Sequence, residues 1–460
     1  MHFDSLDRTD SPLASIEAAA SSPSTSPADA DASSSLTRRG FLRAAAAGGG
    51  LMAVGLAACA TPAAPAWRFG PAGSPAATPL APVGTPMPSV SHGAATPPVS
   101  SPSASIAPGA IPAGWTAHDV AARSVVQRFV GNLAPALQGV YGDAVFAKLA
   151  DILGAQEDPA ELRAKPAYAQ VPQLVLNDAI APLTPELDGD TKVFRLTVEE
   201  MDWPIDELRP PVRALGYNGQ WPGPTIRVTE GDRVRAIFTN NLTETTGVHF
   251  HGVEFDDFFM DGVPFVTQKP IAPGETFTYE FVATRPGSQM YHSHHNATDQ
   301  VGRGLLGAFI VDPRTPGPDD RYDREYVWIS NDTLGGFTIN GHGFPAVVPV
   351  LAAQGETVRI RFMNEGIMMH PWHSHGFRMK VTARDGYDLG GAAFDCDTLG
   401  VNPGERFDVN IVADRLGLWA FHCHILPHVE GLEGMFGMVT ALVVVPTAAD
   451  VDAILGLLLA

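Results

Sequence analysis

The sequence predicts an all-β fold made of two consecutive β-sandwiches, and three patterns support this. From residue 192 onward, short segments alternate apolar and polar side chains, with Gly, Pro and Asn turns between them. The segments lie at 192–198, 225–228, 233–238 and 276–281, and again at 326–329, 357–362, 407–412 and 438–445. Pro-Gly-Glu precedes an alternating segment in both series, at 273–275 and at 403–405. Evenly spaced short strands with such a repeat indicate one antiparallel sandwich that was duplicated.

The repeat places the two sandwiches at 191–314 and 325–446, with a polar, Pro-rich junction between them and a C-terminal tail at 447–460. Upstream, residues 115–190 carry apolar side chains at helical spacing, which predicts a small, mainly helical segment. Residues 61–114 are rich in Pro, Ala, Ser and Thr and almost free of charge. Such a composition cannot bury enough apolar surface to fold, so we expect a disordered linker.

Residues 1–60 are interpreted as a targeting segment. The stretch 37–43 (Thr-Arg-Arg-Gly-Phe-Leu-Arg) precedes an apolar run at 44–58, which is the twin-arginine arrangement. A transmembrane helix is the alternative, but the run is short and holds three consecutive glycines. Cys59 ends a stretch similar to a lipoprotein signal, while Ala58 and Ala60 also fit simple cleavage. We expect export to the periplasm or cell surface, with a lipid tether through Cys59 favoured over simple cleavage.

Composition excludes some partners. The formal net charge of −20 argues against nucleic acid, because phosphate binding needs clustered Lys and Arg. Three cysteines cannot form a disulfide framework. A cysteine with a special role is therefore a ligand, a nucleophile or a lipid anchor.

Histidines supply the strongest functional signal. Most of the fifteen fall in four short clusters, two in each sandwich. In a strand, side chains at i and i+2 point to the same face, so each His-x-His pair presents two imidazoles side by side. So many convergent imidazoles exceed what one metal ion holds, which predicts a multinuclear site between domains. The clusters are His249-Phe-His251, His292-Ser-His294-His295, His370-Pro-Trp-His373-Ser-His375 and His422-Cys423-His424-Ile-Leu-Pro-His428.

The fourth cluster links two kinds of site. Period-two alternation puts His422 and His424 on one face and Cys423 on the other. A thiolate together with two imidazoles is the ligand set of a blue-copper electron-transfer site. Because Cys423 is bonded through the backbone to both neighbouring histidines, an electron that arrives at the thiolate has a short, mostly covalent route to the cluster behind it.

These four motifs resemble the copper-binding motifs of the multicopper oxidases, specifically of the two-domain, laccase-like type with the type 1 copper in the second domain. The resemblance covers about residues 192–445 and implies two cupredoxin-like Greek-key sandwiches with four copper ions, one type 1, one type 2 and two type 3. It implies type 1 ligation by His370, Cys423 and His428, and type 2 ligation by His249 and His373. The type 3 pair would be held by His251, His292, His294, His375, His422 and His424.

The axial type 1 ligand departs from the family spacing. Five residues after His428, where many members place this ligand, the chain has Glu433. A two-residue insertion would make Met435 the weak axial ligand, with Met438 as the alternative.

The resemblance also implies roles for a carboxylate and for a second copy of the chain. Reduction of O2 to water consumes protons, and Asp261 matches the family acid near the cluster; Asp256, Asp257 and Asp299 are weaker candidates. In two-domain relatives the first domain of one subunit meets the second domain of its neighbour, which implies a homotrimer, and a head-to-tail interface that closes is cyclic. His295 and His342 are not expected to bind copper.

The sequence therefore predicts a copper-dependent oxidoreductase, laccase-like, that takes electrons near His428 from phenols or aromatic amines and passes them through Cys423 to O2. A metal-ion oxidase, for cuprous or manganous ions, is the next hypothesis. A copper nitrite reductase is disfavoured because its cysteine would lie in the first domain, where this chain has Ser293 between the histidines. A non-catalytic copper-binding envelope protein would be expected to have lost some ligands.

Overall fold

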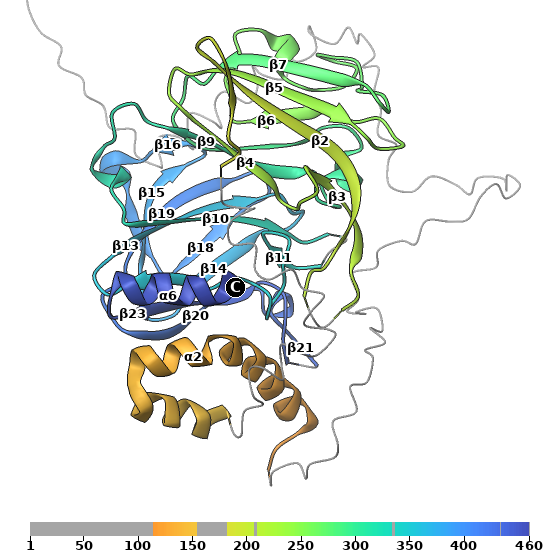
Figure 1. Cartoon of the computed structure of the whole chain (residues 1–460). Coiled ribbons are helices and arrows are strands. Elements are labelled where there is room, and N and C mark those ends of the chain that lie inside the picture. The colour runs from red at the N-terminus through yellow and green to blue at the C-terminus, as the bar shows by residue number, and fades with distance from the viewer. Residues whose placement is uncertain (1–113, 154–181, 207–208, 334–335, 433, 460) are drawn as a thin grey trace, which may run out of the picture. The chain divides into compact units, whose positions relative to one another are not determined.

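The computed structural model describes residues 114–153, 182–206, 209–333, 336–432 and 434–459 (Figure 1). The predicted targeting segment at 1–60, with its twin arginines and Cys59, and the linker predicted at 61–114 except for its last residue lie outside these residues. Within them, the predicted all-β class and its two cupredoxin-like sandwiches are confirmed.

Domain 1 is a sandwich of two sheets. One sheet has the order β1-β2-β5-β7 with β3 paired to β2, and the other has the order β4-β9-β8-β6. Its strands are β1 (Glu186–Asp188), β2 (Thr191–Trp203), β3 (Val212–Tyr217), β4 (Gly223–Thr229), β5 (Arg233–Asn240), β6 (Val248–His251), β7 (Thr276–Val282), β8 (Gly287–Ser293) and β9 (Leu306–Asp312), with η1 (Phe258–Met260) and α5 (Ala297–Gln300) in its loops.

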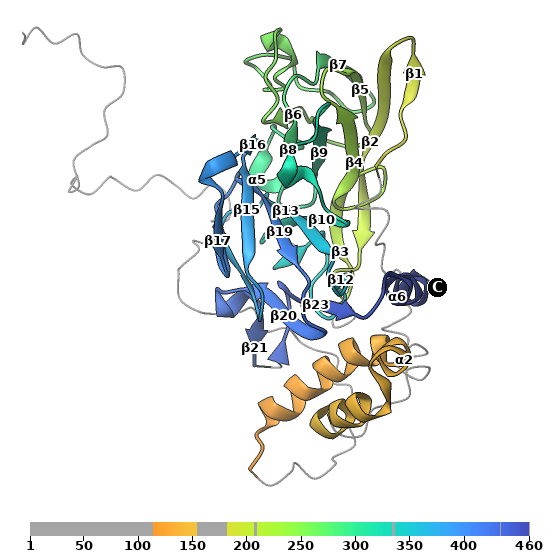
Figure 2. The same ribbon diagram turned by 90° about the vertical axis from the view of Figure 1, so that its left-hand side faces the viewer.

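Domain 2 repeats this plan with more strands in each sheet (Figure 2). One sheet has the order β11-β10-β13-β19-β15-β16 with β17 paired to β15, and the other has the order β12-β23-β20-β14-β18. Its first sheet holds β10 (Arg324–Asn331), β11 (Thr338–Ile339), β13 (Thr357–Asn364), β15 (Met379–Arg384), β16 (Tyr387–Asp388), β17 (Phe394–Cys396) and β19 (Arg406–Val412). Its second sheet holds β12 (Val350–Ala353), β14 (His370–Ser374), β18 (Thr398–Val401), β20 (Gly417–Cys423) and β23 (Val439–Val445). The remaining elements are η2 (Pro318–Asp320), η3 (Gly390–Ala392), η4 (Leu426–His428), β21 (Glu430–Gly431) and β22 (Gly434–Met435).

The sheets are mixed rather than purely antiparallel, which corrects the sequence expectation. β2 runs parallel to β5 and β4 runs parallel to β9, and domain 2 has the equivalent parallel pairs β10/β13 and β12/β23. Strand alternation alone does not distinguish a hairpin neighbour from a strand that crosses over to the sheet edge. Because each domain has two equivalent parallel pairs, the pairing supports the duplication that the sequence repeat indicated.

An apolar core fills each sandwich, and a third cluster joins them. That third cluster contains Trp203, Trp221 and Met290 from domain 1, together with Ile329 and Met363 from domain 2, all buried. Buried polar contacts cross the same boundary, because the Ser288 hydroxyl donates to Asp408 at 2.5 Å and the Arg361 guanidinium donates to the Ser288 hydroxyl oxygen at 2.8 Å. The two domains therefore share a continuous interior.

Two helices belong to domain 2. Helix α2 (Ala117–Leu153) breaks at Gly142, where φ is +76°, and helix α6 (Ala448–Leu459) follows the last strand. Both contribute buried side chains to the domain 2 core, and Tyr141 of α2 donates its hydroxyl to Val444 O at 2.6 Å. The range 115–190 was predicted as mainly helical, but strand β1 lies near its C-terminal end. The tail expected at 447–460 consists largely of helix α6. No helix within the described ranges combines the length and apolar character needed to cross a membrane.

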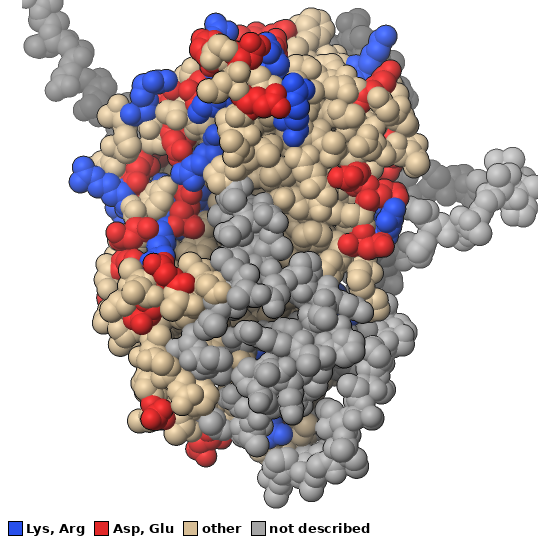
Figure 3. All heavy atoms as spheres, in the orientation of Figure 1, with Lys and Arg blue, Asp and Glu red and all other residues tan. Residues whose placement is uncertain are grey.

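Charged side chains of both signs lie close together on the face shown in Figure 3. Among the described residues, Arg235 has acidic partners of this kind, since its guanidinium pairs with Asp188 at 2.6 Å and also with Glu280.

Candidate metal centre

One buried thiol lies between two imidazoles in domain 2. Strand β14 begins at His370, strand β20 ends at Cys423, and η4 ends at His428. The Cys423 Sγ atom is 3.7 Å from Nδ1 of His370 and 3.6 Å from Nδ1 of His428, and all three residues are buried. The structure therefore brings together the three residues predicted as type 1 ligands, with one donor atom of each converging on a common point.

Burial sets the protonation states of these groups. It raises the pKa of the Cys423 thiol to about 11 and, together with the nearby His370, lowers the pKa of His428 to about 4. The His428 imidazole can then act as a neutral ligand, while the Cys423 thiol must lose its proton when a metal binds. The donor set, one thiolate and two imidazoles, fits copper.

Asp332 is a partner of this site that sequence reasoning missed. Its Oδ2 lies 3.2 Å from Nε2 of His370, the nitrogen that points away from Cys423. Burial opposes the charge on Asp332, but the contact with His370 and hydrogen bonds from the backbone N–H groups of Ile367 and Met368 outweigh burial and lower its pKa. A charged carboxylate here fixes the orientation of the His370 ring and increases its basicity.

The two methionines predicted as possible axial ligands, Met435 first and Met438 as the alternative, differ in burial. Met435 lies on β22 with 37% of its surface exposed, whereas Met438 is completely buried in the domain 2 core. The Met438 backbone also hydrogen bonds to two of the type 1 candidates, donating to His428 O at 3.1 Å and accepting from Cys423 N at 3.0 Å. The short β21/β22 hairpin accommodates the extra residues between His428 and the next strand, so the insertion carries Met435 outward and keeps Met438 inside.

Domain 1 gathers four histidines on one sheet. His249 and His251 lie on β6, and His249 is paired in register with His292 on β8, while His294 follows that strand. The ring centroid of His249 is 5.5 Å from those of His292 and His294, and 5.8 Å from that of His251. Burial lowers the pKa of His251 to about 3, with smaller contributions from Arg406 and the other imidazoles, so its ring is a neutral ligand at physiological pH.

Domain 2 gathers an equivalent set. His373 on β14 is paired in register with His422 on β20, and His375 and His424 lie just beyond these strands. The Nε2 atoms of His375 and His422 are 3.1 Å apart, and the ring of His373 is 4.9 to 5.6 Å from the other three. Nitrogen atoms that converge in this way can share a metal-ion site.

Hydrogen bonds at Nδ1 leave Nε2 free on several of these rings. His249 Nδ1 lies 2.7 Å from the carbonyl oxygen of Asp261, and His373 Nδ1 lies 2.9 Å from that of Asp397. His292 and His422 make the same kind of contact with the carbonyl oxygens of the residues that follow them, Ser293 and Cys423. A donor hydrogen at Nδ1 places the free electron pair at Nε2, where a metal ligand needs it.

The two sets stay apart within one chain. Among the ring contacts of the described residues, every histidine–histidine pair of these eight lies inside one set. The members at the end of each set, His294 in domain 1 and His375 and His424 in domain 2, are exposed. Each set therefore has at least one histidine at the surface of the chain.

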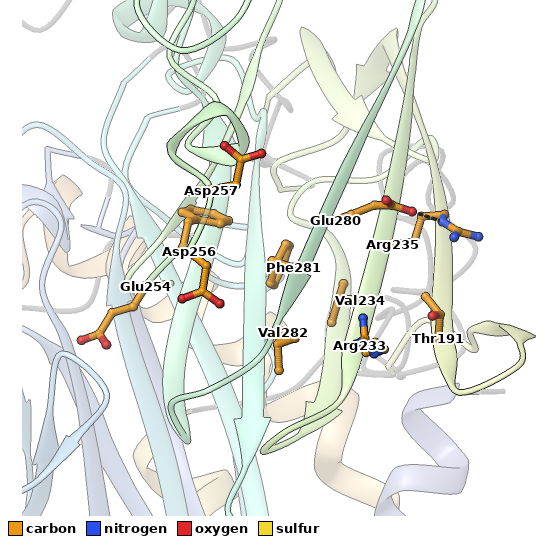
Figure 4. A pocket seen from close by; sticks show the side chains of 11 residues that line it. Thr191, Arg233, Val234, Arg235, Glu254, Asp256, Asp257, Glu280, Phe281 and Val282 are labelled. Atoms are coloured by element: carbon orange, nitrogen blue, oxygen red, sulfur yellow. Dashed lines mark hydrogen bonds and ion pairs between the residues drawn. The ribbon is translucent and has the colours of Figure 1, made fainter.

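The four aspartates that were considered as proton-relay groups lie in different surroundings. Besides its carbonyl contact, Asp261 has Oδ1 3.4 Å from His249 Nδ1, so it lies beside a predicted type 2 ligand. Asp256 and Asp257 instead line a surface pocket of about 270 Å³ near Glu280 and Arg233, and no histidine lines that pocket (Figure 4). Asp299 is 3.4 Å from the guanidinium of Arg303.

Two histidines that were expected not to bind copper have other contacts. His295 Nε2 lies 2.8 Å from the Thr245 hydroxyl, and His342 is buried against Trp203 with Nδ1 3.3 Å from Ile205 O.

Comparison with known proteins identifies this arrangement of domains and ligands. Residues 197–316 and 319–446 match two family models that are both described as multicopper oxidase, and together these ranges cover more than half of the chain. The chain belongs to the multicopper oxidase family.

Solved relatives share the two-domain core of this multicopper oxidase. A multicopper oxidase named mgLAC is 36% identical with a TM-score of 0.52, and the alignment covers 55% of this chain and 86% of that one. A blue copper oxidase from Nitrosomonas europaea is 32% identical with a TM-score of 0.53, over the same shares of the two chains. Family membership makes copper the cofactor of these ligand sets.

Curated relatives are longer than this multicopper oxidase. Laccase-2 of Botryotinia fuckeliana is 29% identical over 304 residues, which are 57% of this chain and 51% of that protein. The chain spans about half or less of the length of the curated relatives that it matches first.

Proposed function

We propose that this multicopper oxidase is a laccase-like enzyme that couples one-electron oxidation of phenols or aromatic amines to the reduction of O2 to water. The observation that carries the proposal is the buried Cys423 thiol between two imidazoles, linked through the chain to the histidine half-sites. Bound copper would supply the redox chemistry at both places, accepting single electrons at the thiolate site and delivering four to O2 at the histidine cluster.

The residues of the chain perform the remaining tasks. His428 is the type 1 ligand nearest the electron donor, and Cys423 joins the two sites through its peptide bonds. The contact of 2.9 Å between His422 Nδ1 and the Cys423 carbonyl oxygen offers a second, shorter link between them. Met438 is the proposed axial ligand, and Asp261 beside His249 is the proposed relay for the protons that water formation consumes.

A ring of identical subunits, most simply a homotrimer, would complete the histidine cluster. The support is that histidines of both sets are exposed and that both domains carry exposed apolar side chains, Phe265 (81%) and Val266 (74%) in domain 1 and Ile367 (67%) and Leu426 (54%) in domain 2. Exposed apolar patches of this kind mark protein–protein contacts. Contact between unlike patches on successive copies is head-to-tail, and such a contact forms a ring where the rotation between copies closes.

A metal-ion oxidase is the second candidate, and one observation favours it. Met368 and Met369 directly precede His370 and are 38% and 42% exposed. Thioether groups are soft ligands that suit cuprous ions, so these side chains could receive a metal-ion substrate close to the type 1 site.

The cellular location belongs to the proposal as well. The twin-arginine stretch supports export to the periplasm or cell surface, and Cys59 would provide a lipid tether there. Mass measurement of the mature protein from its own host tests both, because cleavage before Cys59 with an added lipid mass is the expected result. An unlipidated N-terminus at another residue would refute the tether.

Oxygen uptake tests the enzymatic proposal. Purified, copper-loaded protein with a phenol should consume one O2 for every four phenol molecules oxidised, without release of peroxide. Cys423→Ser should abolish both the blue colour and this uptake, because serine cannot replace the thiolate. Full uptake by the Cys423→Ser variant would refute the electron path. Rapid uptake with cuprous ions but none with phenols would favour the second candidate.

A further inference from the structure

His428 is enclosed rather than open to solvent. Only 3% of its surface is exposed, and its ring stacks on Phe337 with centroids 4.0 Å apart and planes 15° apart. Since its Nδ1 faces Cys423, the opposite edge of the ring is the side from which an electron donor would approach. What covers His428 therefore controls which donors can come close.

A short hairpin follows His428 and is tied back onto it. β21 and β22 pair Glu430 with Met435, and the Phe436 N–H donates to Val429 O at 2.9 Å. Two residues further along the chain, the Met438 N–H donates to the carbonyl oxygen of His428 at 3.1 Å. The hairpin therefore leaves the chain next to His428 and returns to it, so that both of its ends are held at this ligand.

Helix α2 holds this hairpin from outside. His118 in its first turn contacts the hairpin twice, with Nδ1 3.1 Å from Leu432 O and Nε2 3.3 Å from a Glu430 carboxylate oxygen. Gly434 has φ +102°, and a Cβ built on it would lie only 2.5 Å from the Cα of Ala122. The helix backbone therefore rests directly on the hairpin, at a position where only glycine fits.

The helix is anchored by apolar packing as well. Phe129 of α2 packs on Phe344 with ring centroids 5.0 Å apart, and the Phe344 N–H donates to Gly437 O at 2.8 Å. Val125 and Phe129 are each 7% exposed and belong to the same core as Met438. The helix is therefore part of the domain that holds the type 1 ligands.

We propose that α2 clamps the β21/β22 hairpin, through its described strands, over His428 and so restricts the type 1 site to small electron donors, excluding phenols with several linked rings. This inference rests on the proposed oxidase function, since it names the class of donor that reaches the same site. Single-ring phenols and metal ions fall within the accepted class.

Ala122→Arg is the test, because a long charged side chain at the closest approach to Gly434 must push the helix off the hairpin. Ala147→Arg is the matched control, since Ala147 lies on the same helix at an exposed position. Two donors with the same reacting ring are compared, 2,6-dimethoxyphenol and the two-ring syringaldazine. We expect Ala122→Arg to raise kcat/KM for syringaldazine about tenfold while that for 2,6-dimethoxyphenol changes less than about twofold. Ala147→Arg should leave both unchanged.

A second measurement does not depend on turnover. In the copper-free full chain, diethyl pyrocarbonate should modify His428 slowly in the wild type and in Ala147→Arg, and several times faster in Ala122→Arg, as followed by peptide mass mapping. Faster modification without any gain for syringaldazine would overturn the selection of donors. Equal modification rates in all three proteins would overturn the clamp. Absence of turnover with either phenol in the copper-loaded wild type would instead refute the phenol-oxidase function. The clamp would then be tested by the modification rates alone.

Discussion

The separation of the two histidine sets within one chain leads to a quantitative prediction about assembly. His251→Ala breaks the half-site of domain 1, and His375→Ala breaks the half-site of domain 2, while each variant keeps Cys423 and the type 1 ligands. Either variant alone should lose O2 reduction, because every cluster in its assembly would contain one damaged half. A mixture of the two should regain part of it.

The recovered fraction follows from the geometry. If domain 1 of one subunit meets domain 2 of the next, a cluster is intact only where a His375→Ala chain supplies domain 1 and a His251→Ala chain supplies domain 2. Random assembly of equal amounts gives that pairing at about one quarter of all interfaces, and mixed trimers that carry both tags have it at about one interface in three. A cluster built within a single chain would give none, because every chain carries a broken half.

The assay is O2 uptake by variants that are co-expressed with different tags and purified through both tags in sequence. Native mass spectrometry checks that mixed assemblies have formed. His295→Ala is a suitable control, because this neighbouring histidine contacts Thr245 and lies outside both sets. If verified mixed assemblies have no activity, the head-to-tail account is wrong.

Further predictions concern individual side chains. Met438→Leu should change the blue absorption and raise the type 1 reduction potential, whereas Met435→Leu should change neither; the reverse pattern in a redox titration would restore Met435 as the axial ligand. Asp332→Asn should also raise the potential, because it removes a negative charge 3.2 Å from His370, and an unchanged potential would contradict the role given to that carboxylate. Burial lowers the pKa of His342 to about 4, below its ordinary value, so the unfolded chain binds a proton that the folded chain does not, and stability falls as pH drops from about 6.5 towards 4. In urea unfolding of the copper-free protein, His342→Gln should reduce the loss of stability between pH 7 and pH 5 by about 2 kcal/mol, and an equal loss in both proteins would refute the buried neutral state.

Local periodicity explains which parts of the site could be predicted from the sequence. His-x-His pairs on strands have only one geometry, with both rings on one face, so the half-sites and the opposite placement of Cys423 followed from spacing alone. Asp332 gave no such signal, because it comes from the other sheet of domain 2 and meets His370 only in the folded chain. Met435 was preferred to Met438 because sequence spacing cannot show that a hairpin accommodates the intervening residues.

The helices show the same limit. Apolar spacing indicated a helical segment before the sandwiches, but its contact with the hairpin after His428 joins residues about three hundred positions apart. The segment at 448–459 lies beyond the last strand, and its helix depends on packing against domain 2, where Val451 and Ile454 are completely buried. Such placements depend on tertiary contacts rather than on local pattern.

The copper content per chain tests the central claim most directly. It should be measured by elemental analysis on native assemblies that have been reconstituted with copper and desalted. The account predicts close to four copper ions per chain, one at the Cys423 site and three at a cluster completed between subunits. A content of about two would contradict the trinuclear cluster and favour a site like that of nitrite reductases, and one or none would refute the oxidase function itself.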